Sequence, residues 1–284
     1  MRRLDNLGIP DTDYRYIQVN QDQDKDNEAI YINNLICDFV RDNNFEPLKN
    51  KKFKVEFINY GDTELVYVIK TEDGKLYTML IGQPKNELGT VKEEFDNLSN
   101  LSKNNDFIVK PEYYYSNGEK ELMITPYEYQ ARCIAGKNNK YGMYIPEPYY
   151  RFEPFKKEEE HMVNTCMVAN LVRAHEDNKG IIETRLGGGD FILRKEYSAF
   201  YQTYESLLKN MKLTSVRKLI DIDLKDYLEL LRNELSKVTY YSDIKDRDNS
   251  IIVNQKNRAK MLNDSIEDGI SLGLSLREQK DYMK

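Results

Sequence analysis

Apolar residues alternate with polar ones at 53–57 in the first half of the chain, and two further short runs, at 65–69 and 76–81, are almost wholly apolar. A period of two residues is typical of strands with one buried face. Between the second and third runs stands Glu72-Asp-Gly, whose glycine can adopt the positive φ that a tight hairpin turn requires. The pattern therefore predicts a three-stranded antiparallel meander.

Apolar residues spaced three and four apart flank this meander and predict helices over 26–42 and 90–103. The second of these helices carries Glu94 on its apolar side. A further strand pair is predicted between Ile108 and Thr125, with Ser116-Asn-Gly as its turn. Residues 52–130 should therefore form an antiparallel sheet with the helix near 90–103 packed on it.

Helical spacing dominates the second half, where helices are predicted over 157–176, 195–212, 214–220, 223–238 and 255–280. The last helix has a broad apolar face, and Gly269 and Gly273 lower its intrinsic helix propensity. Packing must hold it, either on the other helices of this half or on a partner.

Pro146, Pro148 and Pro154 remove backbone donors and block a helix, so an extended or mobile connector is expected there. The chain is thus predicted to be α+β with two lobes. Four segments are expected: an N-terminal arm and helix at 1–50, a β-rich small lobe at 51–135, a Pro-rich connector at 136–156 and a helical large lobe at 157–284.

Composition narrows the function classes. The net charge of the 284 residues is -6, which argues against nonspecific nucleic-acid binding. No apolar window is long enough for a membrane span, and the N-terminus lacks the apolar region of a secretory signal. Three widely spaced cysteines and two histidines leave little material for disulfides, a zinc site or a Ser-His-Asp hydrolase. A cytoplasmic location is expected.

Five short motifs follow one another along the chain in an order that is similar to that of a known protein family. They are Gly61-Asp-Thr-Glu-Leu-Val-Tyr, Tyr77-Thr-Met-Leu-Ile, Glu94-Phe-Asp-Asn-Leu-Ser-Asn-Leu, Ile108-Val-Lys-Pro and Leu122-Met-Ile-Thr-Pro-Tyr. Together they resemble the small lobe of the protein-kinase-like fold in its aminoglycoside-phosphotransferase form. The resemblance covers about residues 50–195 and implies a bilobal fold, with ATP and Mg²⁺ as possible cofactors.

The second half carries the rest of the resemblance. Leu171-Val-Arg-Ala-His is similar to the end of the family's first large-lobe helix, and the segment from Ile182 to Leu193 has the apolar frame of its catalytic loop. Arg185 stands where the resemblance implies the catalytic aspartate, and Asp190 where it implies the metal-binding asparagine. Leu80 stands at the position of the nucleotide-binding lysine, and no metal-binding Asp-Phe-Gly element follows Leu193.

These departures predict a degenerate, pseudokinase-like protein, because phosphoryl transfer needs a cation on the phosphates, carboxylates for Mg²⁺ and a base. Substitutes are conceivable: Arg185 for a phosphate, and Glu183 or Asp190 for the metal. The resemblance further implies Glu94, Gly61, Thr125 and Tyr127 as nucleotide-site candidates.

Three other residue types have simpler interpretations. His175, at the end of an apolar helix, is expected to be packed and hydrogen-bonded rather than a general base. The cysteines Cys133 and Cys166 have no basic neighbour in sequence and are expected to be buried structural residues. Three glycines at 187–189 are expected to form a tight turn rather than a phosphate loop, because no helix follows them.

Three functions remain open at this point. The first is a catalytically silent kinase-like binding or scaffold protein with a protein partner. The second is an active phosphotransferase that uses displaced residues. The third is an unrelated α+β structural or assembly protein of a phage or mobile element. No particular oligomeric state is predicted.

Overall fold

A computed structural model of the chain describes residues 39, 53–60, 64–82, 89–127, 131–133, 157–177, 179–182, 191–194, 203–236 and 250–282. The contacts divide the chain into two units. The first comprises 1–96, 110–129 and 143–148, and the second comprises 97–109, 130–142 and 149–284.

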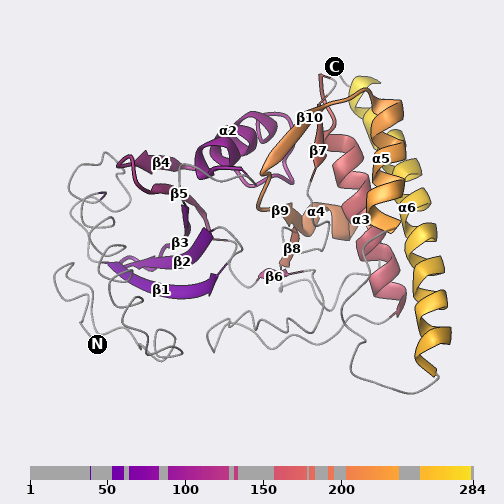
Figure 1. Cartoon of the computed structure of the whole chain (residues 1–284), viewed down its shortest axis with the longest axis horizontal. Helices are drawn as coiled ribbons and strands as arrows, with labels where there is room; N and C mark the ends of the chain where they lie inside the picture. The colour runs from indigo at the N-terminus through magenta and orange to yellow at the C-terminus, as the bar shows by residue number, and fades with distance from the viewer. Residues whose placement is uncertain are drawn as a thin grey trace. The chain divides into compact units, whose positions relative to one another are not determined.

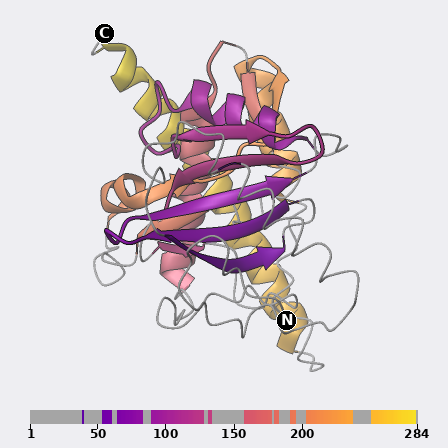
Figure 2. The same ribbon diagram turned by 90° about the vertical axis from the view of Figure 1, so that its left-hand side faces the viewer.

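The first unit contains the predicted antiparallel sheet (Figures 1 and 2). Its five strands are β1 (Phe53–Tyr60), β2 (Glu64–Thr71), β3 (Leu76–Gly82), β4 (Tyr113–Ser116) and β5 (Glu121–Pro126). They lie in the order β1-β2-β3-β5-β4, and every neighbouring pair is antiparallel. The predicted hairpin turn is confirmed, since Gly74 has a φ of 83° and its N–H donates to Thr71 O over 2.9 Å.

The strand register assigns residues to the two faces of the sheet. Leu80 lies opposite Met123, which in turn lies opposite Tyr114, so these three side chains share one face. Helix α2 (Val91–Leu101) packs on this face, because the Phe95 ring lies 5.6 Å from the Tyr114 ring, centroid to centroid. The predicted helix over 90–103 is therefore confirmed, as is its packing on the sheet.

The opposite face of the sheet is covered by a residue from the N-terminal segment. Tyr113 and Tyr115 alternate with Tyr114 and project from that face. The Phe39 ring makes edge contacts with both, at centroid distances of 5.3 and 5.8 Å. Phe39 is helical and fully buried, as expected for the apolar side of a helix over 26–42, whose other residues lie outside the described ranges.

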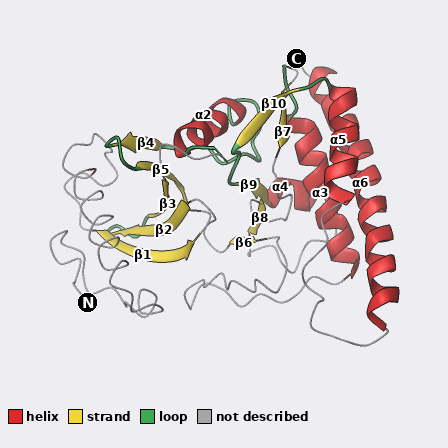
Figure 3. Ribbon diagram, viewed as in Figure 1, coloured by secondary structure: helices red, strands yellow, loops and turns green. Residues whose placement is uncertain are grey.

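The second unit is mainly helical, with two small sheets. Its helices are α3 (Lys157–Ala174), α4 (Tyr204–Asn210), α5 (Leu224–Ser236) and α6 (Ser250–Tyr282), of which α3, α5 and α6 run side by side (Figure 3). One sheet joins β7 (Lys179–Ile182) to β10 (Lys218–Asp221). The other has the order β6-β8-β9, with β6 (Ala131–Cys133), β8 (Phe191–Arg194) and β9 (Met211–Leu213).

Helix α3 forms the centre of this unit, and all residues from 163 to 172 are buried. Helix α6 packs along it through Ser265, Gly269 and Gly273, which follow one another at four-residue intervals and are all buried. The C-terminal helix is therefore held by packing within the second half, the first of the two arrangements expected for it.

Two helix predictions were wrong. Residues 214–220 do not form a helix: 214–217 are irregular and 218–220 belong to β10. The predicted helix over 195–212 is helical only at 204–210 among its described residues, and 211–212 belong to β9. In both places the local spacing of apolar residues favours a helix. Pairing with a strand from another part of the chain, β7 or β8, determines the conformation instead.

Some expectations cannot be compared with the structure. The Pro-rich segment 136–156 and the three glycines at 187–189 lie outside the described residues. In the ranges that are described, no helix combines the length and apolar character that crossing a membrane requires. The α+β fold class is confirmed, with a sheet in the first half of the chain and helices in the second.

Candidate functional site

Leu80 and Glu94 are brought to the same side of the sheet in the first unit. Leu80 lies in β3 on the face where α2 packs, and its side chain is almost completely buried. Glu94 of α2 is fully buried, in agreement with its predicted place on the apolar side of this helix. The Leu80 side chain offers no charge to a phosphate or to a carboxylate. Glu94 is a different case, because ionisable groups buried this deeply are often part of a functional site.

The carboxylate of Glu121 ties α2 to the β4–β5 hairpin. One of its oxygens accepts the N–H of Lys92 over 3.1 Å, and the other accepts the Tyr114 hydroxyl over 2.7 Å. Burial raises the pKa of Tyr114, and the hydrogen bond to Glu121 raises it further, to about 12. These contacts fix the first turn of α2, which positions Glu94.

Thr125 and Tyr127 lie where β5 ends. Thr125 is buried and lies opposite Thr78, on the same face as Leu80. The N–H of Tyr127 donates to Leu76 O over 3.3 Å, which prolongs the pairing of β5 with β3. Gly61, the remaining nucleotide-site candidate, lies outside the described residues.

The predicted catalytic loop is described only at its two ends. Glu183, Arg185 and Asp190 lie outside the described residues. The strand before the loop, β7, ends at Ile182, and the strand after it, β8, begins at Phe191.

The register of β8 identifies a second segment at the end of the strand pair where β8 begins. Phe191, the first residue of β8, pairs with Leu213, the last residue of β9. Because the two strands are antiparallel, residues 214–217 begin at that end of the pair. Sequence reasoning missed this segment because 214–220 was predicted as a helix. The alternation in Met211-Lys-Leu, followed by Thr-Ser-Val, was the available signal for extended structure.

Hydrogen bonds fix the 214–217 segment in the second unit. The side-chain amide of Asn97 donates to Val216 O over 3.1 Å and to Arg217 O over 3.2 Å. On the other side of β9, Leu213 N–H donates to Phe107 O over 2.8 Å and Leu213 O accepts the N–H of Val109 over 2.9 Å. The described part of the candidate site is therefore the end of β9, which hydrogen bonds hold to Asn97 and to residues 107–109.

His175 has a structural environment. It is 3% exposed, and its ring stacks on Tyr227 at a centroid distance of 5.1 Å. Its Nε2 lies 2.8 Å from Ile222 O. A carbonyl only accepts hydrogen bonds, so Nε2 carries a proton and is not available as a base. This agrees with the packed, hydrogen-bonded histidine expected from the sequence.

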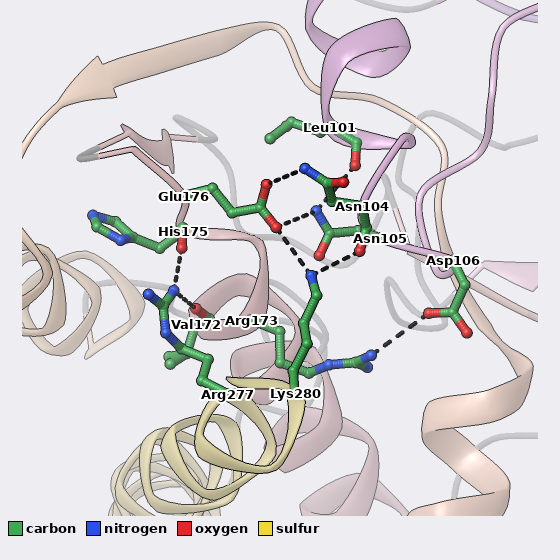
Figure 4. Close-up of polar contacts among 10 residues, drawn as sticks. All are labelled: Leu101, Asn104, Asn105, Asp106, Val172, Arg173, His175, Glu176, Arg277 and Lys280. Atoms are coloured by element: carbon green, nitrogen blue, oxygen red, sulfur yellow. Dashed lines mark hydrogen bonds and ion pairs between the residues drawn. The ribbon is translucent and has the colours of Figure 1, made fainter. Parts of the chain in front are cut away.

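A network of polar side chains joins the end of α3 to α6 and to the loop after α2 (Figure 4). Glu176 accepts hydrogen bonds from Asn104 over 3.0 Å, from Asn105 over 3.4 Å and from Lys280 over 3.1 Å. Burial raises the pKa of Glu176, but these donors outweigh it and the pKa is lowered overall. Arg277 donates to the carbonyls of Val172 and His175, so α6 also satisfies the C-terminal end of α3.

His161 connects Ser265 and Asp268 in a second polar cluster. Its Nδ1 lies 2.9 Å from Ser265 Oγ, and its Nε2 lies 3.1 Å from Asp268 Oδ2. These are the residue types of a hydrolase triad, but Ser265 is fully buried and out of reach of a substrate. The cluster joins α3 to α6 and does not form a hydrolase site.

Comparison with known proteins gives structural similarities only. No model of a protein family matches the sequence, and no curated protein matches it. The autoinhibited serine kinase domain of the giant muscle protein titin is 15% identical with a TM-score of 0.39, and the match covers 60% of this chain and 46% of that chain. The kinase PK-1 of Cydia pomonella granulovirus is 14% identical with a TM-score of 0.40, and the match covers 68% of this chain and 60% of that chain. The chain thus spans less than two thirds of either structure.

Proposed function

We propose that this chain is a catalytically silent, kinase-like protein that acts by binding a protein partner. The observation that carries the proposal is the position of Leu80. The sheet has the order β1-β2-β3-β5-β4 with α2 inserted between β3 and β4, and this is the arrangement that the sequence resemblance implies for a kinase-like small lobe. Within it, Leu80 stands where the sequence resemblance implies the lysine that would hold the nucleotide phosphates.

The second unit supports the same conclusion. The loop that resembles the catalytic loop carries Arg185, which does not lose its proton and cannot serve as a base. The neighbouring residues 214–217 supply no carboxylate for a metal. Each loss removes a different part of transition-state stabilisation, so a neighbouring group cannot make up for all of them.

A cytoplasmic location and a protein partner are part of the proposal, as is the resemblance to the aminoglycoside-phosphotransferase form of the fold. Weak nucleotide binding is compatible with it, because an adenine slot depends on apolar contacts and on backbone groups such as those near Thr125 and Tyr127.

The test is a two-part assay on the full chain. The melting temperature is measured with ATP and Mg²⁺, and radiolabel transfer from ATP is measured to the protein itself and to small hydroxylated acceptors, aminoglycosides included. We expect no transfer and no hydrolysis above the rate without protein. A metal-dependent transfer that is lost in Asp190→Ala but retained in Asp264→Ala, an exposed control on α6, would establish the active phosphotransferase instead.

A further inference from the structure

The turn between β4 and β5 contains Asn117-Gly118, the single Asn-Gly pair of the sequence. Ser116 pairs with Glu121, so residues 117–120 form the loop of this hairpin, and Asn117 and Gly118 are both exposed. The side-chain amide of an asparagine can react with the backbone nitrogen of the next residue, because their bond closes a five-membered ring within one chain. The hairpin loop is therefore a place where the chain can modify itself.

Gly118 supplies the nitrogen for this reaction. Its φ is 90°, and a Cβ atom built on it would meet no other atom within 4 Å, so the space around the residue is open. Since glycine has no side chain, nothing on Gly118 hinders the approach of its nitrogen to Asn117 Cγ. The Gly118 N–H donates to Ser116 Oγ over 3.2 Å. Ser116 is exposed, and its hydroxyl both accepts and donates, so it offers the Gly118 proton a path to water.

Two backbone donors hold the side-chain oxygen of Asn117. Its Oδ1 accepts the N–H of Glu119 over 3.0 Å and the N–H of Lys120 over 2.9 Å. Attack on Asn117 Cγ places negative charge on this same oxygen in the tetrahedral intermediate. Donors that point at an oxygen on which charge develops stabilise the transition state. The loop thus combines an activated amide with an unhindered nitrogen.

We propose that Asn117 is a site of spontaneous deamidation in the folded chain, by way of a succinimide. The Gly118 nitrogen loses its proton to water or hydroxide and bonds to Asn117 Cγ, and the side-chain nitrogen takes up a proton and leaves as ammonia. Water then opens the ring. Its addition at Cγ gives aspartate, and its addition at the main-chain carbonyl carbon of residue 117 gives isoaspartate. This modification is independent of the proposed function.

The isoaspartate form weakens the hairpin. It adds one carbon atom to the main chain after residue 117 and displaces the oxygen that accepts the N–H groups of Glu119 and Lys120. The next residue, Glu121, begins β5 and accepts the Lys92 N–H at the start of α2 over 3.1 Å. Aspartate keeps both the chain length and the acceptor, so only isoaspartate disturbs the contact between the hairpin and α2.

The test is an ageing experiment on the full chain. The protein is incubated at mildly alkaline pH in water enriched in the heavy oxygen isotope, with a parallel sample in urea, and both are mapped by mass spectrometry of peptides. We expect the peptide with Asn117 to exchange its amide for a labelled carboxylate, as both aspartate and isoaspartate, at least as fast in the folded chain as in urea. Asn100 and Asn263, exposed on α2 and α6, should stay unmodified in the folded chain, because helical hydrogen bonds hold the N–H that follows each.

Two variants complete the test, and their melting temperatures show that they fold. Gly118→Ala should slow the reaction severalfold, because its Cβ hinders the nitrogen. Asn117→Asp should release no ammonia at this position, and a fully aged wild-type sample should melt below it. If Gly118→Ala does not fold, the wild-type comparison decides alone. Modification of Asn117 in urea only, or in neither sample, would overturn the proposal, because the bonds to Oδ1 would then protect the amide. Aspartate without isoaspartate would also overturn it, since direct hydrolysis forms no succinimide.

Discussion

Gly269 of α6 and Val168 of α3 lie so close together that a side chain on the glycine has no room. A Cβ atom built on Gly269 would lie 2.6 Å from Val168 Cβ and 2.7 Å from Thr165 O. Real Cβ atoms do not approach other atoms this closely. The two helices therefore depend on glycine here, and Gly273 meets Val172 in the same way one turn later.

The variant Gly269→Ala should destabilise the protein. Overpacking costs about 1–3 kcal/mol, and we expect this cost to exceed the gain of about 1 kcal/mol in helix propensity. Urea unfolding followed by circular dichroism measures the difference. Ser275→Ala on the exposed side of α6 is the matched control and should be neutral or slightly stabilising. If Gly269→Ala were as stable as the Ser275→Ala control, the close approach of the two helices would be contradicted.

Arg277 is expected to hold the end of α3. Its guanidinium donates to the carbonyls of Val172 and His175, which lie at the end of α3, where the donors of a following helical turn are missing. Arg277→Met removes a charged donor and should lower the free energy of unfolding by about 1.5–3 kcal/mol. Arg277→Lys keeps the charge near the helix C-terminus and should fall between Met and wild type in the same urea titration. A Met variant as stable as wild type would show that these bonds contribute nothing.

Glu176 should make the free energy of unfolding depend on pH. Burial raises its pKa, but the hydrogen bonds from Asn104 and Lys280 lower it overall in the folded chain. A folded-state pKa below the unfolded one means that the stabilisation is fully present above the unfolded value of about 4.3. It is lost as the pH falls through the folded value.

The measurement compares wild type with Glu176→Gln by urea unfolding between neutral and acidic pH. Wild type should be more stable near neutrality, and the difference should shrink as the pH drops below about 4.3. Glu278→Gln, an exposed position on α6, should show no such trend. A difference between wild type and Glu176→Gln that stays constant over this range would mean that Glu176 is not stabilised as a carboxylate.

The sheet was predictable because its signals are local. The alternation at 53–57, the apolar runs at 65–69 and 76–81 and the glycine of Glu72-Asp-Gly act within a few residues, so β1 to β3 follow from the sequence itself. Residues 211–221 were not predictable in this way. Their strands are three and four residues long and exist because β7 and β8 pair with them, and nothing in the local spacing identifies a distant partner.

The same distinction applies to the candidate site. The burial of Glu94 follows from its helical spacing with Leu98, which a sequence displays. The role of Asn97 does not, because its amide bonds to a carbonyl that lies 119 residues further along the chain. Gly269 was correctly expected to weaken α6 as an isolated helix, but only the structure shows that it lets Val168 approach.

Cys166 should resist thiol reagents until the protein unfolds. Its side chain is fully buried in α3, and its sulfur lies 3.8 Å from Tyr204 O. Burial raises the pKa of this thiol to about 12, so the reactive thiolate is scarce at neutral pH as well as inaccessible. Labelling with iodoacetamide, followed by peptide mapping, should leave the α3 peptide unmodified in the native protein and modify it in urea. The variant Cys166→Ala identifies that peptide, and rapid native labelling of it would show that α3 opens to solvent far more readily than a helix at the centre of a packed unit should.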